Sequence, residues 1–193
     1  MEFQKIQLTK QKTLNVTYKD GDGNVVQFTG ANIVHRDLRQ AINALVPHLA
    51  VVTEQREAYN RTLTDIRKDK ITDEGNDSVF KRLDVDGLTF GNGEREVAIS
   101  GQRILTTAGV VMLQTPKIDI EDDEQYKYAG DLALDIDAVK FEARAYVEER
   151  KWGVKEAEIA FEDIDPFQGV KADEVPISDG KAPKKRGRKS KAA

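Results

Sequence analysis

The chemistry most visible in this 193-residue sequence is electrostatic, and it is concentrated at one end. Residues 181–193 hold seven lysines and arginines and no acidic residue. The other 180 residues carry 23 basic and 34 acidic side chains, so a body of net charge −11 is joined to a segment of +7. Because clustered cations release counterions from phosphates, this composition favours contact with nucleic acid. The candidate nucleic-acid-binding residues are Lys184, Lys185, Arg186, Gly187, Arg188, Lys189 and Lys191.

The centre of this segment is Arg186-Gly187-Arg188, which has lysines on both sides. It resembles the AT-hook, a short DNA-binding segment whose glycine lets the backbone lie in the minor groove while the two arginines point along it. The sequence departs from that pattern because the nearest proline, Pro183, lies upstream of Lys184. What the resemblance then implies is contact with phosphates, and neutralising five of them gives a salt slope of roughly −3.5 to −4.5 on logarithmic axes. The alternative is a solubilising tail without a ligand.

Aromatic side chains are the second group that could contact a nucleic acid, by stacking on unpaired bases. The run Tyr126-Lys127-Tyr128 places a cation between two rings, so Tyr126 and Tyr128 are candidate stacking residues. If the sheet binds single strands, stacking would also involve the aromatic residues of the predicted strands, Phe3, Tyr18, Phe28 and Phe90. The alternative for all these rings is packing in the core.

The residues needed for most catalytic and metal chemistry are missing or poorly spaced. There is no cysteine, which excludes thiolate zinc sites and cysteine nucleophiles, and the only histidines are His35 and His48. The acidic residues between Asp119 and Glu124 follow one another closely, which favours a solvated loop over a magnesium site. No phosphate-binding or dinucleotide-binding glycine motif is present. We therefore expect no enzymatic activity, no cofactor and no bound metal.

The elements that must position these residues begin with a group of strands and a helix. Alternating apolar residues over 5–30 predict strands, with a hairpin turn at 20–24. From Arg36, apolar residues recur every three or four positions, which predicts an amphipathic helix. Pro47 should break or kink this helix near Val46, because proline cannot donate the backbone hydrogen bond. A short charged helix is expected within 57–79.

A second group of strands and a helix follows. Strands are predicted at 83–90, 96–105 and 110–120, and the acidic pair Asp84 and Asp86 should lie on the solvent face of the first of them. A second amphipathic helix is expected over 131–150, with Asp131 capping its first turn.

The predicted fold class is α+β: an antiparallel strand meander plus a helix, formed twice in a pseudo-repeat, with two amphipathic helices packed on the sheet. A faint sequence echo between Val26–Gly30 and Val97–Gly101 motivates the pseudo-repeat, and similar hairpin geometry is the alternative explanation. An OB-like barrel is the alternative architecture. The expected organisation is a domain over 1–160, an acidic linker over 161–180 and a disordered basic tail over 181–193.

The sequence therefore predicts a non-enzymatic nucleic-acid-binding accessory protein that contacts DNA through its basic tail, and single-stranded and double-stranded DNA both stay open. In composition it resembles small accessory proteins of bacteriophage and prophage. A protein- or small-ligand-binding module with an acidic body, for example a phage factor engaging a host protein, is the alternative, and a homo-oligomer is also open. Neither a signal peptide nor a membrane span is recognisable, so we expect the cytoplasm of a bacterial or phage-infected cell.

Overall fold

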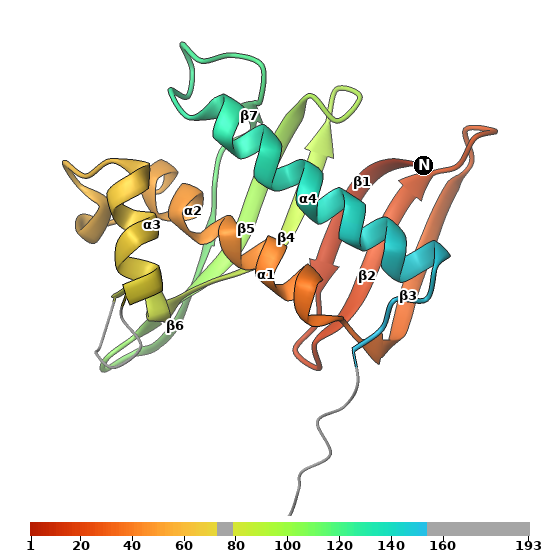
Figure 1. The fold of residues 1–193 in the computed structure, drawn as a ribbon, viewed down its shortest axis with the longest axis horizontal. Helices are drawn as coiled ribbons and strands as arrows, with labels where there is room; N and C mark the ends of the chain where they lie inside the picture. Colours follow the sequence, from red (N-terminus) through yellow and green to blue (C-terminus); the bar gives the residue numbers. More distant parts are fainter. Residues whose placement is uncertain (73–78, 154–193) are drawn as a thin grey trace, which may run out of the picture. The chain divides into compact units, whose positions relative to one another are not determined.

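The computed structural model describes residues 1–72 and 79–153. Its sheet is antiparallel and has the strand order β3-β2-β1-β4-β5-β6, with the short β7 also pairing with β5 (Figure 1). The strands are β1 (Glu2–Leu8), β2 (Thr13–Lys19), β3 (Val25–Ile33), β4 (Leu83–Gly91), β5 (Glu96–Leu105), β6 (Gly109–Gln114) and β7 (Ile118–Asp119). The helices are α1 (Arg36–Ala44), α2 (Val46–Val52), α3 (Leu63–Thr72) and α4 (Ala129–Glu148), with 3₁₀ turns η1 (Arg56–Ala58) and η2 (Val79–Arg82).

Two three-stranded meanders make up the sheet, which confirms the predicted α+β class. The meander β1-β2-β3 is followed by α1, and the meander β4-β5-β6 is followed, after β7, by α4. The meanders join where β1 and β4 pair antiparallel through Lys5–Thr89, Ile6–Leu88 and Gln7–Gly87. The sheet stays open, with β3 and β6 at its two edges, so the alternative of an OB-like barrel is wrong.

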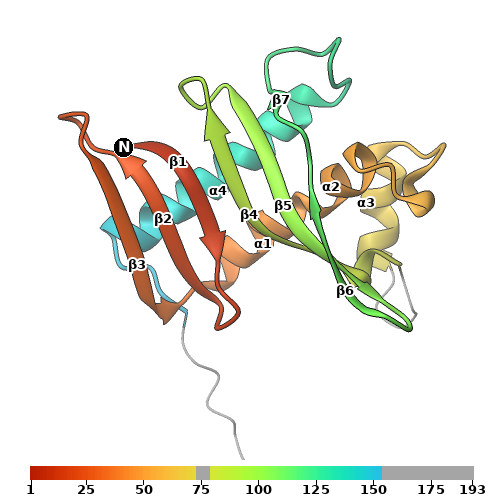
Figure 2. The same cartoon turned by 180° about the vertical axis from the view of Figure 1, so that it is seen from behind.

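Helices α1, α2 and α4 all lie on one face of the sheet, and the view from behind shows the other face uncovered (Figures 1 and 2). Alternation along the strands sends every second side chain to the helix side, where it is buried. The buried strand residues include Ile6, Leu14, Val16, Leu88, Val97 and Ile99, and the helices add Leu38, Ile42, Leu49, Leu132, Ile136 and Val139.

The first amphipathic helix is divided in two, as predicted. Helix α1 begins after His35, whose Nδ1 accepts a hydrogen bond from the Asp37 amide, and Leu45 separates it from α2. Pro47 then stands in the first turn of α2, where its missing N–H costs no hydrogen bond.

Two details of the second half differ from the prediction. The strand predicted over 110–120 is divided into β6 and β7, because Pro116 between them cannot donate to a strand ladder. Helix α4 begins at Ala129 with Tyr128 at its N-cap and no side-chain capping bond, so Asp131 lies inside the first turn rather than at the cap.

The sequence echo between 26–30 and 97–101 has a packing origin. The two segments lie on β3 and β5, which occupy different places in their meanders, so they are not equivalent copies. Both end on a glycine that faces a helix. A Cβ on Gly30 would lie 2.3 Å from the hydroxyl of Tyr146 on α4, and one on Gly101 would lie 2.3 Å from the carbonyl oxygen of Asp84 on β4 and 2.7 Å from Cδ2 of Leu49 on α2. Glycine is therefore favoured at both positions, where a helix side chain and the backbone of the neighbouring strand both come close.

Among the described residues, no helix combines the length and the apolar composition needed to cross a membrane.

Candidate nucleic-acid interface

The basic residues from Lys184 to Lys191 lie outside the described residues, and so do the expected linker and the boundary near residue 160. Their contact with nucleic acid stays a prediction. The candidate residues that lie within the described ranges are Tyr126 and Tyr128.

Tyr126 is part of the core. Only 8% of the residue is exposed, and its hydroxyl lies 2.8 Å from Nδ1 of the fully buried His48. Its ring packs edge-on against Tyr128 with 5.7 Å between centroids. Burial raises the pKa of the Tyr126 hydroxyl, so it stays protonated. These contacts correspond to the packing alternative, and they leave no free ring face on which a base could stack.

Tyr128 is half-buried, and both its ring and its hydroxyl are engaged. The hydroxyl accepts a hydrogen bond from the Leu63 amide at 3.2 Å, and the Lys127 ammonium lies 4.7 Å from the ring centroid. Tyr126 and Tyr128 therefore pack together in the segment before α4, and Tyr128 connects this segment to the start of α3. They do not form a surface on which bases could stack.

His48 is the centre of a polar network behind Tyr126. Its Nε2 lies 3.2 Å from Oδ2 of Asp135 on α4, and the same oxygen accepts from Arg67 of α3 at 2.8 Å. Arg67 also donates to Asp131 at 3.1 Å. Because buried polar groups must be paired, the network fixes α2, α3 and α4 to one another. The polar groups of the network form hydrogen bonds with one another, so we assign the network a structural role.

The strand aromatics also point away from the uncovered face. Phe28 packs edge-on against Tyr146 of α4, with 6.1 Å between centroids, and the Lys140 ammonium of α4 lies 5.4 Å from the centroid of Phe90. Phe3 and Tyr18 belong to the same helix-side core. The uncovered face instead presents short polar side chains such as Asn15, Thr17, Gln27, Thr29, Ser100 and Gln102. Base stacking on this sheet face is therefore not supported by the described strands.

Cations without carboxylate partners gather at one end of the sheet. Lys10 and Lys12 lie in the turn between β1 and β2, and Arg36 and Arg39 lie in the first turns of α1. None of the four forms an ion pair with any described residue. Several cations elsewhere are paired, as where Arg103 meets Glu57 at 2.6 Å. Since the body as a whole is acidic, a group of unpaired cations is a local exception that attracts anions.

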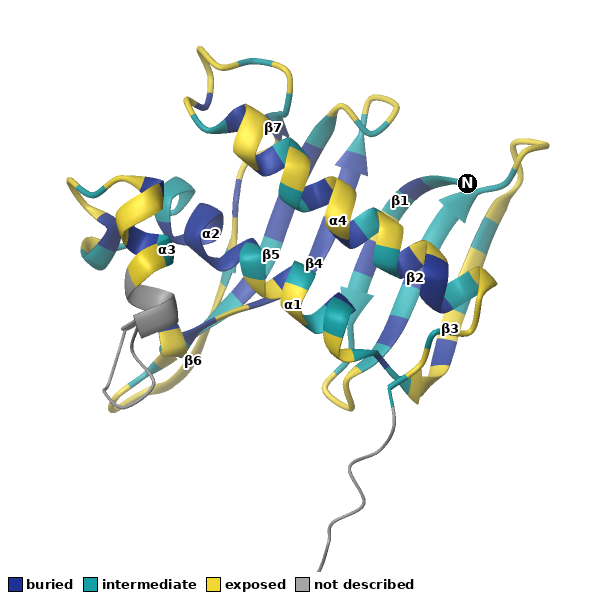
Figure 3. Cartoon of the chain, in the orientation of Figure 1, coloured by how far each residue is buried: buried dark blue, intermediate teal, exposed yellow. Residues whose placement is uncertain are grey.

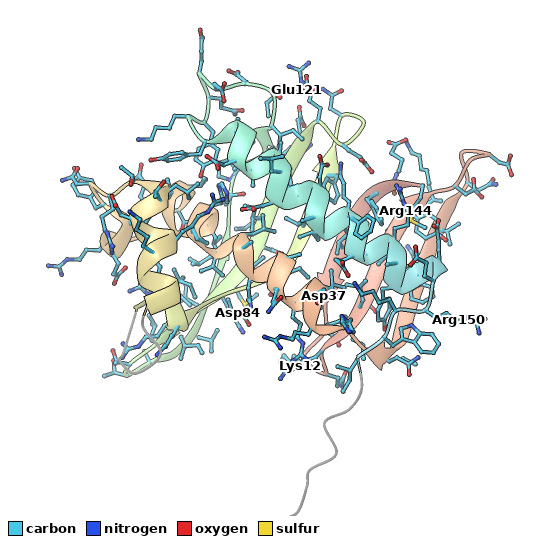
Figure 4. All side chains as sticks on the ribbon, viewed as in Figure 1. Lys12, Asp37, Asp84, Glu121, Arg144 and Arg150 are labelled. Carbon is cyan, nitrogen blue, oxygen red and sulfur yellow. The ribbon has the colours of Figure 1, made fainter. Side chains whose placement is uncertain are left out.

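The turn that carries Lys10 and Lys12 is stabilised by hydrogen bonds between its two threonines. The hydroxyls of Thr9 and Thr13 lie 2.8 Å apart, and the Thr13 amide donates to the Thr9 hydroxyl at 3.1 Å. Lys12 has a positive φ of 60°, and its carbonyl accepts from the Val34 amide just before α1. This last bond holds the turn beside the start of α1, near the lower edge of the sheet in Figure 4.

A groove of about 760 Å³ lies between this turn, α1 and β4. Lys10, Lys12 and Arg39 line one part of it, and Asp84 and Asp86 of β4 line another. The groove exists because β1 pairs with β4 only as far as Gln7–Gly87, while β4 continues to Leu83. At the groove, Nε of Arg39 is buried without a hydrogen-bond partner among the described residues. A buried donor left unpaired is costly to the fold.

Comparisons with protein-family models, with curated proteins and with solved structures found no match. Within 1–72 and 79–153, no group of three or more histidine or acidic side chains is arranged to hold a metal ion. The groove and its cations are therefore the strongest candidate site in this part of the chain.

Sequence reasoning missed Lys10, Lys12 and Arg39. A weak signal was present, because Lys10-Gln11-Lys12 separates two predicted strands and no acid lies nearby in the sequence. Arg39 is 27 residues beyond Lys12, and only the fold brings α1 beside this turn. Asp84 and Asp86 were expected on a solvent face, and the structure adds that this face borders the groove.

Proposed function

We propose that the protein is a non-enzymatic nucleic-acid-binding protein that uses two groups of cations, the groove cations Lys10, Lys12 and Arg39 and the basic residues within 181–193. The observation that carries the proposal is the unpaired state of the groove cations in an otherwise acidic body. Phosphate oxygens would supply the acceptors that these side chains lack.

The acidic body limits where a polyanion can approach. Most of the surface should repel phosphates, so binding should depend on a few local contacts and fall steeply with salt. The groove supports one such contact, because its arginine and lysines come from a turn and a helix that are fixed by hydrogen bonds.

The test is a fluorescence-anisotropy titration of the full chain with short labelled oligonucleotides at several salt concentrations. One variant changes Lys10, Lys12 and Arg39 to glutamine, and a second changes the seven lysines and arginines within 181–193 to glutamine. Each variant should bind more weakly than the unmodified chain. The groove variant should reduce the salt slope by roughly 2 to 3, because three phosphate contacts are removed.

The matched control changes three exposed cations elsewhere on the body, Arg56, Lys127 and Arg144, to glutamine. It removes the same charge from the body but leaves the groove intact, so its affinity should stay much closer to that of the unmodified chain. Equal losses for the control and the groove variant would contradict a groove contact. Unchanged affinity in every variant, or no binding at low salt, would contradict the proposed function.

A second candidate function, association with another protein chain, is favoured by β6. This edge strand contains no charged residue and no proline, and Val110 and Met112 are 54% and 65% exposed. Edge strands normally carry such residues to prevent pairing with other chains. Figure 3 shows β6 exposed along most of its length.

A further inference from the structure

The groove is lined by cations and by carboxylates that do not form ion pairs with one another. Lys10, Lys12 and Arg39 line it together with Asp84 and Asp86, yet no ion pair joins the two groups. A site for a simple polyanion would not be expected to include two carboxylates, because they weaken its attraction for phosphate. The groove instead fits a ligand with an anionic part and a separate part that donates hydrogen bonds.

The two carboxylates differ in how far they are already engaged. Oδ1 of Asp86 accepts a hydrogen bond from the Ser100 hydroxyl at 2.9 Å, and the Asp86 side chain is half-buried. Asp84 is exposed. Its only side-chain hydrogen bond among the described residues is a long one, which Gln102 donates to Oδ2 at 3.4 Å. Asp84 therefore has the oxygen atoms available to accept from a ligand.

We propose that the groove binds one unpaired nucleotide of a single-stranded nucleic acid, with its phosphate on Lys10, Lys12 and Arg39 and the edge of its base on Asp84. This proposal rests on the proposed function and deepens it, because it selects single strands over duplexes. A base can reach Asp84 in this way only when its hydrogen-bonding edge is not already paired.

The chemistry of a carboxylate selects among the bases. An ionised aspartate can only accept hydrogen bonds, and its two oxygens can accept from two neighbouring donors. On the pairing edge, guanine presents two adjacent donors, the ring N1–H and the exocyclic amino group. Adenine, cytosine and thymine each place an acceptor beside their donor. The groove should therefore prefer guanine.

The remaining wall suits the flat face of a base. Val110 and Met112 of β6 line the groove and are largely exposed. Methionine is unbranched and polarizable, so it adapts well to an aromatic surface. The volume of about 760 Å³ lies within the range of small-ligand sites and accommodates one nucleotide.

The test measures binding of the full chain to short oligothymidine strands that carry one central guanine, hypoxanthine or abasic site. Hypoxanthine lacks only the exocyclic amino group, so it removes one donor and leaves size and stacking almost unchanged. Guanine should bind roughly three- to tenfold more tightly than hypoxanthine, because a hydrogen bond to a charged acceptor is lost. The fully complementary duplex of the guanine strand should bind more weakly than the single strand.

The variant Asp84→Asn separates base recognition from electrostatics. It keeps the size of the side chain but replaces one acceptor by a donor, so the difference between guanine and hypoxanthine should disappear. The same variant should bind the abasic strand more tightly, because one negative charge beside the cations is lost. The control Asp123→Asn removes an exposed charge elsewhere and should keep the preference for guanine.

Equal affinity of the unmodified chain for guanine, hypoxanthine and abasic strands would overturn the nucleotide site while leaving nucleic-acid binding intact. Affinity for the duplex equal to or above that for the single strand would also overturn it. Failure to bind any strand at low salt is a different result, because it contradicts the proposed function itself.

Discussion

At the scale of single residues, Lys12 has an unfavourable backbone conformation and a side chain that lines the groove. Its φ of 60° is a left-handed conformation that favours glycine, yet a long cationic side chain occupies it. For a residue with a side chain this conformation costs about 1 to 2 kcal/mol. The conformation points the carbonyl to Val34 and places the ammonium group on the groove. Strain of this kind is often kept where it positions a functional group.

The variant Lys12→Gly should therefore separate stability from binding. We expect the free energy of unfolding to rise by up to about 1 kcal/mol, since the relieved strain exceeds the extra entropy of the unfolded chain. Affinity for oligonucleotides should fall. Urea unfolding and anisotropy titration measure the two effects. The control Lys10→Gly, at a position without positive φ, should lose stability instead. A shift of the same sign in both variants would contradict strain at Lys12.

At the scale of elements, the network around His48 decides how the helices meet. Helix α2 supplies His48, α3 supplies Arg67 and α4 supplies Asp135, while Tyr126 completes the network from the segment before α4. Among the residues of helix α3 whose burial is described, 63–68, Leu63 and Ile66 lie in the core. The polar contacts add to this apolar packing, and they hold in place an insertion between the two meanders.

Replacing His48 by phenylalanine should destabilise the fold by roughly 1 to 3 kcal/mol, because the Tyr126 hydroxyl and the Asp135 carboxylate lose a buried partner while the ring volume is kept. Tyr126→Phe should also be destabilising. Chemical unfolding of the two single variants and the double variant then forms a cycle. The double variant should lose less than the sum, by about 0.5 kcal/mol or more. Strict additivity would show that the two side chains do not interact.

At the scale of the whole molecule, the two edge strands β3 and β6 both lack charged residues and proline, and they differ in what lies beside them. The end of β3 is covered, since the Gly153 amide donates to the carbonyl of Ile33 and Val34 pairs with Trp152. Along β6 no described residue pairs with the outer edge. Because β6 carries no charge, antiparallel pairing with β6 of a second copy would bring no like charges together. We expect this edge to join two copies of the chain.

Light scattering of the full chain should then give a mass that rises to that of a dimer with increasing concentration. Val111→Lys places a charge on the pairing strand and should keep the protein monomeric. The matched control is Val25→Lys on β3, which adds the same charge at an exposed valine of the other edge and should leave the dimer intact. A monomer at every concentration, or equal effects of both variants, would contradict pairing through β6.

The local sequence pattern was sufficient to predict much of the fold but little of the candidate site. Period-two alternation located most strands, and the three- and four-residue spacing located α1 and α4. The division of the strand over 110–120 was missed, although Pro116 in the sequence carried the signal. Packing of Tyr126 in the core stayed open as the alternative to base stacking, because its partner His48 lies 78 residues away and alternation along the chain does not indicate such contacts.

By itself, the sequence determined the strand and helix pattern, the break at Pro47 and the separation of an acidic body from a basic segment. These properties follow from neighbouring residues, so they can be read along the chain. Only the tertiary structure decided that the sheet is open, that its aromatic rings face the helices, and that Lys12, Arg39 and Asp84 line one groove. The groove arises where the pairing of β1 with β4 stops, which depends on contacts more than 70 residues apart in the chain.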